Sequence, residues 1–139
     1  MGILLFGRSK NNLLQSNVIT NTDHGIGLYY DSDHNKIINN TVQNNKLGII
    51  LDNISNNLGY GNNLVNCSQS GYDDNNYKWD IDRAGNYWGE SNNQNISDSG
   101  YVVPPAGIDY SPADELIPVI TAQEQPITAD TLAMLTGNI

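Results

Sequence analysis

The chain has 139 residues, of which only 6 are Lys or Arg and 15 are Asp or Glu, giving a formal net charge of −9. This acidity argues against a nucleic-acid partner, because phosphate binding needs clustered basic side chains. A single Cys excludes an internal disulfide and any CxxC metal or redox site, and every apolar stretch is far shorter than the roughly 18–20 residues of a membrane span.

A 23-residue repeat runs through the N-terminal part of the sequence. Gly2, Gly25, Gly48 and Gly71 are spaced by that interval, and the first three open the similar phrases GILL, GIGL and GIIL. Apolar residues alternate in short runs within each period, which predicts short strands and not helices. A unit of this size buries an apolar face only by stacking, so we predict an all-β parallel β-helix of about four rungs over residues 1–89.

Asparagine occurs 22 times, and one copy recurs at the same place in each period. Asn tolerates the left-handed backbone of a corner, and its amide can bond the amide of the next rung. We therefore expect a structural ladder formed by Asn17, Asn40, Asn63 and Asn86. The alternative is that these four are solvated turn residues in an Asn-rich chain.

The fourth period, residues 71–89, departs from the pattern. Asp74 and Arg83 stand at positions that are apolar or aromatic in the earlier rungs, so two core positions have become polar. Trp88 stands in the slot that Ile19 and Val42 occupy. A large ring there could cover the end of a narrow core, so we expect a capping rung that ends near residue 89.

Residues 90–139 form a second region with all five Pro and no basic residue. This composition predicts an acidic, loop-rich tail that is extended at residues 101–103 and 116–120. Thr128 as an N-cap predicts a short helix over residues 128–136. We expect the tail to pack on its own β-helix or on a neighbouring subunit.

The repeat phrases Gly-Ile-x-Leu, Ser-x-x-Asn-x-Leu/Ile and Asn-x-Ile/Val cover about residues 2–89. They resemble the right-handed parallel β-helix repeats of NosD-like and related carbohydrate-associated surface proteins. The phrases GNYWG at 85–89 and IDYSP at 108–112 resemble the C-terminal ends of such proteins in archaea and bacteria. The resemblance implies a right-handed β-helix and an extracellular or cell-surface location, and some relatives bind or cleave polysaccharides.

An enzyme of this fold would present carboxylates on the outer face of neighbouring rungs. Asp80 and Asp82 alternate along the chain, so on a strand they would share a face about 6.5–7 Å apart, compatible with an inverting glycosidase pair. Arg83 lies alongside. The pair belongs to the degenerate rung, however, and the other acids do not recur at the spacing of the repeat. We therefore expect solvated turn carboxylates and no enzymatic activity.

The sequence offers weak candidates for metal ligands. Asp73 and Asp74, followed by Asn75 and Asn76, supply the oxygen ligands that calcium prefers, although their spacing matches no EF-hand loop. We expect no cofactor, with calcium as the alternative. The residues that could bind copper are His24, His34, Met1 and Met134. The two His occupy different places in their rungs, which argues against a shared copper site.

Aromatic residues indicate a candidate sugar-binding face. Phe6 and Tyr29 are in phase on consecutive rungs, and Tyr30 is adjacent. Exposed rings beside Asn and Asp side chains are typical of carbohydrate sites. Alternatively, the rings pack on each other across rungs.

The first rung begins in phase at Gly2 without a degenerate cap, which leaves a strand edge and an apolar layer uncovered. We expect preceding rungs or a copy of the chain to cover it, and no membrane span. The sequence thus predicts a noncatalytic structural or adhesive module of an extracellular or cell-surface protein, with end-to-end assembly into a filament or layer as one option. The alternative is a carbohydrate-binding or polysaccharide-cleaving β-helix module whose partners are surface glycans.

Overall fold

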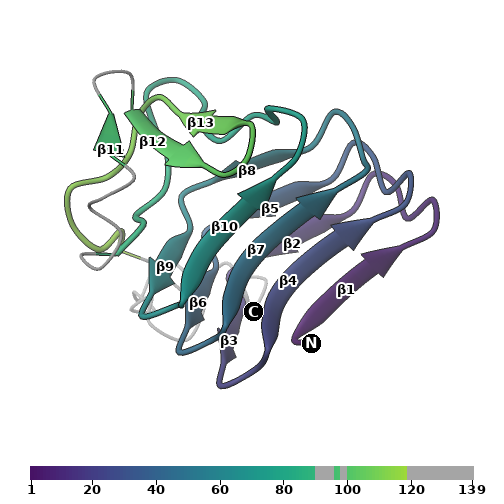
Figure 1. Ribbon diagram of the computed structural model, residues 1–139, viewed down its shortest axis with the longest axis horizontal. Helices are drawn as coiled ribbons and strands as arrows, with labels where there is room; N and C mark the ends of the chain where they lie inside the picture. The colour runs from purple at the N-terminus through teal and green to yellow at the C-terminus, as the bar shows by residue number, and fades with distance from the viewer. Residues whose placement is uncertain (90–95, 98–99, 119–139) are drawn as a thin grey trace, which may run out of the picture.

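The computed structural model describes residues 1–89, 96–97 and 100–118, so the helix expected at 128–136 lies outside the described residues. The chain winds into a parallel β-solenoid whose strands stack into three parallel sheets (Figure 1). The largest sheet contains β1 (Ile3–Phe6), β4 (His24–Tyr29), β7 (Leu47–Asp52) and β10 (Gln69–Asp73). The second contains β2 (Leu13–Gln15), β5 (Lys36–Ile38) and β8 (Leu58–Tyr60), and the third β3 (Val18–Thr20), β6 (Thr41–Gln43) and β9 (Asn63–Val65).

The prediction of an all-β parallel β-helix is confirmed, and the described residues contain no helix. The solenoid has about three turns, slightly fewer than the four expected. The fourth turn adds only β10 as a strand, and continues the other two sheets through the isolated bridges Leu58 to Lys78 and Asn63 to Tyr87. Short strands with alternating side chains therefore do form where the apolar alternation predicted them.

The core is a set of columns in which inward side chains of successive turns lie on one another. Ile26 pairs with Ile49, and Leu28 pairs with Leu51, in the largest sheet. All four side chains are fully buried. Each turn contributes similar apolar residues to the same columns, and burial is complete in the second and third turns but only partial at Ile3, Leu5 and Leu14 of the first.

The corners explain why asparagine is so frequent. Among the described residues, eight Asn adopt left-handed backbone with φ between 51° and 59°, a conformation that Asn tolerates better than most residues. Asn39 is one of them, and it directly precedes Asn40, whose side chain bonds the neighbouring turn. Asn44 and Asn45 repeat the arrangement at another corner. An Asn-Asn dipeptide thus turns the chain with its first residue and links two turns with its second.

The asparagine ladder runs through Asn17, Asn40, Asn62 and Asn86. The prediction of Asn63 as its third member is wrong by one position, because Asn63 instead bonds the backbone of Ile117. The cause is a shortened corner in the third turn. Tyr29 pairs with Asp52 at the full spacing of the repeat, whereas Lys36 pairs with Leu58, one position short of that spacing.

The same shift changes two other assignments, and a separate tight turn changes a third. Asp73, and not Asp74, follows Leu51 in the inward column. The slot of Ile19 and Val42 recurs 23 residues on at Val65, but the residue that pairs with Val42 and is fully buried is Leu64. Arg83 is exposed in a turn and enters no core column.

The C-terminal end of the solenoid is closed by aromatic rings. Trp88 is 3% exposed, stacks on Tyr101 with ring centroids 4.4 Å apart, and meets Trp79 edge-on at 5.2 Å. Tyr101 belongs to a small antiparallel sheet of β11 (Ile96–Ser97), β12 (Gly100–Val103) and β13 (Gly107–Asp109). Figure 1 shows this sheet at the β10 end, away from β1. The segment 100–118 therefore packs on its own solenoid.

Two fully buried carboxylates hold the cap together. Asp73 accepts a hydrogen bond from the Trp79 indole at 2.6 Å, and Asp109 accepts one from the Trp88 indole at 2.8 Å. Burial raises the pKa of both carboxyls, although the indole and backbone N–H groups oppose that effect. These aspartates tie the rings to the last turns by accepting hydrogen bonds.

Candidate functional site

A cleft of about 440 Å³, most of whose lining residues carry amide or hydroxyl groups, lies at the corner between the third turn and the partial fourth turn. Its walls are two short segments that the solenoid stacks, residues 55–58 and residues 75–78. The parallel bridge between Leu58 and Lys78 holds the segments in register. Asn56 and Asn76 both adopt left-handed backbone, which turns the chain at the rim of the cleft. Amide side chains therefore gather at this corner because its left-handed backbone positions favour Asn.

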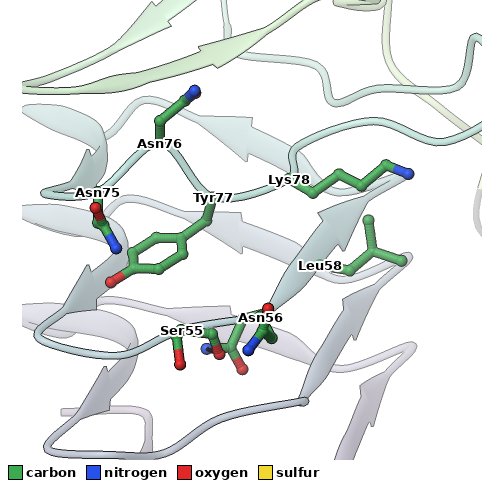
Figure 2. A pocket seen from close by; sticks show the side chains of 8 residues that line it. Ser55, Asn56, Leu58, Asn75, Asn76, Tyr77 and Lys78 are labelled. Atoms are coloured by element: carbon green, nitrogen blue, oxygen red, sulfur yellow. Dashed lines mark hydrogen bonds between the residues drawn. The ribbon is translucent and has the colours of Figure 1, made fainter.

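Tyr77 fixes the floor of the cleft (Figure 2). Its hydroxyl donates to the backbone carbonyl of Ile54, accepts from the Ile54 N–H at 3.0 Å, and lies 3.0 Å from an oxygen of Asp74. Its backbone N–H donates to Asp73 at 2.9 Å. Burial and the nearby carboxylates raise the pKa of Tyr77 to about 12, so its hydroxyl stays protonated at neutral pH. Tyr77 is a rigid anchor for the amides around it.

A second hollow of about 280 Å³ adjoins the cleft, since Asn76, Tyr77 and Lys78 line both. Its far side includes Asp80 and Tyr110, and the Tyr110 side chain is 57% exposed. Figure 2 shows the Lys78 side chain extending along the cleft beside Leu58. The combined groove offers amide groups, one ammonium group, the carboxylate of Asp80 and one exposed ring.

Asp80, Asp82 and Arg83, the alternative catalytic residues, lie in and beside a tight turn and not on a strand. Asp82 and Arg83 have φ of 49° and 66° in a tight turn closed by the Ile81 to Ala84 bridge, so residues 80–82 are not a strand. Asp80 accepts a hydrogen bond from the Ser111 hydroxyl at 3.0 Å. The condition for the alternative catalytic pair, that Asp80 and Asp82 lie on one strand, is therefore not met.

Asp52 and Asp74 form a carboxylate pair elsewhere in the structure. They are 22 residues apart and not 23, so the regular spacing of the repeat does not reveal the pair in the sequence. Asp52 and Asp74 follow paired positions of β7 and β10, and lie close enough to share a hydrogen bond. Burial, followed by the charge of Asp74, raises the pKa of Asp52. Glycosidase carboxyl pairs are about 5–9.5 Å apart, so two carboxyls in direct contact do not match that geometry.

The predicted calcium ligands also point apart. Asp73 is fully buried and accepts hydrogen bonds from the Trp79 indole and from the backbone of Asn75 and Tyr77. Asp74 accepts from the Asn53 N–H at 3.0 Å, beside Asp52. Because Asp73 is committed to the cap and Asp74 to the neighbouring turn, the two do not form a shared cation site.

The predicted aromatic residues lie along the outside of the largest sheet. Phe6 pairs with Tyr29 in register, but the ring contact is between Phe6 and Tyr30, edge-on at 4.8 Å. Phe6 and Tyr30 are 57% and 55% exposed. The Tyr29 ring instead lies close over Gly27, a position where a Cβ atom would collide with it. The exposed pair therefore contains Tyr30, while Tyr29 packs against the sheet.

The donors present do not assemble into a copper site. His24 begins β4, whereas His34 is exposed in a left-handed turn position. Burial raises the pKa of the Cys67 thiol, so it remains protonated at neutral pH. In residues 1–89, 96–97 and 100–118, no three His, Cys, Asp or Glu side chains come together as a metal site. These donors do not fit a copper ion, and Met134 lies outside the described residues.

Two residues of the cap were missed from the sequence. Asp109 continues the spacing of the ladder after Asn86, so that spacing could have identified it as the next member. The spacing of the repeat could not have identified Trp79. Its ring lies beside Gly59, which is 20 residues earlier in the chain and not 23. The described segments also contain no helix long and apolar enough to cross a membrane.

Comparison with known proteins supports one assignment. The family model described as "Periplasmic copper-binding protein (NosD)" matches residues 1–94. No curated protein matches the chain significantly. No solved structure matches it significantly either. Because the matched segment includes all three parallel sheets and the ladder up to Asn86, this chain belongs to the NosD family of β-helix proteins.

Proposed function

We propose that the chain is a noncatalytic structural module of a protein in the cell envelope or outside the cell. The observation that carries this proposal is the use of its acidic residues. Asp73 and Asp109 hold the indole rings of the cap, and Asp52 and Asp74 contact each other. The word "periplasmic" in the family description supports a location outside the cytoplasm.

The test is an activity assay on the full chain. Polygalacturonate, alginate and xylan are incubated with the protein, and reducing ends and unsaturated products are measured. We expect no product above a heat-denatured sample. Product formation that disappears in Asp52→Asn would overturn the proposal, because it would make the carboxylate pair catalytic.

A second candidate function is adhesion through polysaccharide binding, which the polar groove favours. Amide groups both donate and accept hydrogen bonds, so Asn56, Asn75 and Asn76 could pair with vicinal hydroxyls. The exposed ring of Tyr110 offers an apolar surface for the C–H face of a sugar, and Lys78 would favour an acidic sugar.

Affinity electrophoresis through gels that contain each polysaccharide tests this second function. We expect retardation of the wild type, and weaker retardation of Tyr110→Ala and Lys78→Gln. Phe6→Ala is the matched control, since it removes an equally exposed ring from β1, at the opposite end of the solenoid from β13. Retardation lost only in Phe6→Ala would move the site to the Phe6–Tyr30 pair, and equal mobility of all variants with and without polysaccharide would contradict binding.

A further inference from the structure

Two carboxyl groups meet at the edge of the largest sheet, where the third turn of the solenoid lies against the fourth. β7 and β10 pair in register up to Leu51 and Asp73. The next residues along the two segments, Asp52 and Asp74, therefore lie side by side, and their side chains share a hydrogen bond. Two ionised carboxylates have no hydrogen to place between them, so this contact requires a bound proton.

Asp74 has a second contact that is short of hydrogen atoms. Its Oδ1 lies 3.0 Å from the Tyr77 hydroxyl oxygen, and its Oδ2 accepts from the Asn53 N–H at 3.0 Å. A tyrosine hydroxyl carries one hydrogen, and here it is donated to the Ile54 carbonyl, while the Ile54 N–H donates back to the hydroxyl oxygen. The Tyr77 hydrogen is thus committed elsewhere, and the carboxyl pair has to supply its own proton.

No positive charge compensates the pair. In the described part of the chain, both ion pairs of Lys, Arg or His involve other aspartates. The titratable groups around the pair are Tyr29 on β4, Asp73 on β10, Tyr77, and Asp31, whose N–H donates to the Asn53 carbonyl. All four are acids. Burial, followed by the charge of Asp74, accordingly raises the pKa of Asp52.

The pair also joins the third turn to one wall of the groove. Residues 75–78 form that wall, and Asp74 is the residue directly before them. On the opposite side, Asp52 directly precedes Asn53 and Ile54, whose backbone groups bond Asp74 and Tyr77. Repulsion between two ionised carboxylates would act across this same seam between the turns.

We propose that Asp52 and Asp74 form a pH-sensitive clasp between the third and fourth turns of the solenoid. With one proton on the pair, the clasp is closed and residues 74–77 are held against Asn53 and Ile54. With both carboxyls ionised, the clasp opens and this wall of the groove loosens locally. Because the folded chain binds the proton more tightly than the unfolded chain, the clasp is closed at acidic pH and opens as the pH rises. The device goes beyond the proposed structural function and does not depend on it.

Amide hydrogen exchange tests the clasp, measured on the full chain residue by residue with NMR over a pH series. Protection factors are compared, because they remove the intrinsic pH dependence of exchange. We expect protection of the Asn53 and Ile54 amides to fall by about fivefold or more between about pH 4 and neutral pH. The internal control is the Asn63 amide of the same third turn, which donates to the Asn40 carbonyl at 2.8 Å. It reports any loss of stability in the whole chain, and we expect its protection to fall less.

Two substitutions sharpen the test. Asp52→Asn replaces the titrating carboxyl with an amide that can donate to Asp74 at every pH. We expect protection of the two clasp amides to stay at its acidic level in this variant. Asp23→Asn is the matched control, because it removes an exposed carboxylate that pairs with Lys46 at another corner. The control should show the same fall as the wild type.

The proposal is overturned if the two clasp amides lose no more protection than the Asn63 amide in the wild type. It is also overturned if Asp52→Asn loses as much protection as the wild type over the same pH range. The wild-type comparison decides the matter by itself if Asp52→Asn does not fold. No polysaccharide or activity assay enters this test, so failure of the clasp is distinguishable from failure of the noncatalytic function.

Discussion

The two ends of this solenoid are built from the same repeat and yet differ in almost every physical respect. At the first turn, Leu14 is partly buried and the neighbouring outward side chains are exposed. At the other end, Trp79, Trp88 and Tyr101 close the core, and two buried carboxylates satisfy the indoles. The difference shows how the C-terminal end of this stacked repeat is closed. Large rings fill the last layer of the core, and the Asp109 carboxylate accepts the last hydrogen bonds of the ladder.

The largest effect is expected from a substitution that removes a ring of the C-terminal cap. We expect Trp88→Ala to lower the free energy of unfolding by about 3–5 kcal/mol, because it leaves a cavity and removes the donor to Asp109. Urea unfolding followed by circular dichroism measures the change. Phe6→Ala is the control at the opposite end, where an aromatic side chain that is 57% exposed should cost below about 1 kcal/mol. Similar costs for both would mean that the ends do not differ.

An intermediate effect is expected within one core column. Leu14 of the first turn pairs with Ile37 of the second, which is fully buried. We expect Ile37→Ala to cost about 2–5 kcal/mol and Leu14→Ala about 1–2 kcal/mol, because the open layer has less burial to lose. The same urea titration reports both values. An equal loss would show that the first layer is as well covered as the second.

The smallest expected effect is on the pH dependence of stability. The pKa shifts of two groups of carboxyls have opposite directions, so the two groups change the stability in opposite ways as the pH rises. Burial raises the pKa of Asp52, Asp73 and Asp109, so the folded chain holds protons that the unfolded chain releases, and their contribution to stability falls as pH rises above about 4. For Asp33 burial opposes the change, but hydrogen bonds from Lys10 and Ser55 lower its pKa. Its contribution is therefore lost as pH falls through the folded value.

Single substitutions separate these opposite effects. Asp52→Asn should flatten the loss of stability between about pH 4 and neutral pH, whereas Asp33→Asn should remove stability mainly at neutral pH. Urea midpoints at several pH values provide the measurement. Parallel pH profiles for the wild type and Asp52→Asn would argue against a proton shared by Asp52 and Asp74.

Most of the fold could be predicted from the sequence, because strand alternation and corner residues are local and repeated. The ladder was misassigned at one position for a simple reason. Asn62 and Asn63 are adjacent, so the loss of one residue at the preceding corner left an Asn at the expected spacing. That same loss concealed the stacking of Asp52 on Asp74.

The groove was harder to predict than the ladder. It depends on how residues 55–58 and 75–78 stack after the register shift, and on where β13 places Tyr110. Nothing in the local sequence fixes the relation between those segments. By contrast, Asp109 continues the spacing of the ladder, and its termination role follows from an acceptor-only side chain.

The contrast between Asn86 and Asp109 has a genetic consequence. A ladder asparagine and its terminating aspartate differ only in an amino group replaced by an oxygen, and their codons differ by a single base. One point mutation can therefore replace a side chain that both accepts and donates along the ladder by one that only accepts. Deamidation of a ladder asparagine would make the same change of side chain in an ageing protein and would remove the amide donor to the next turn.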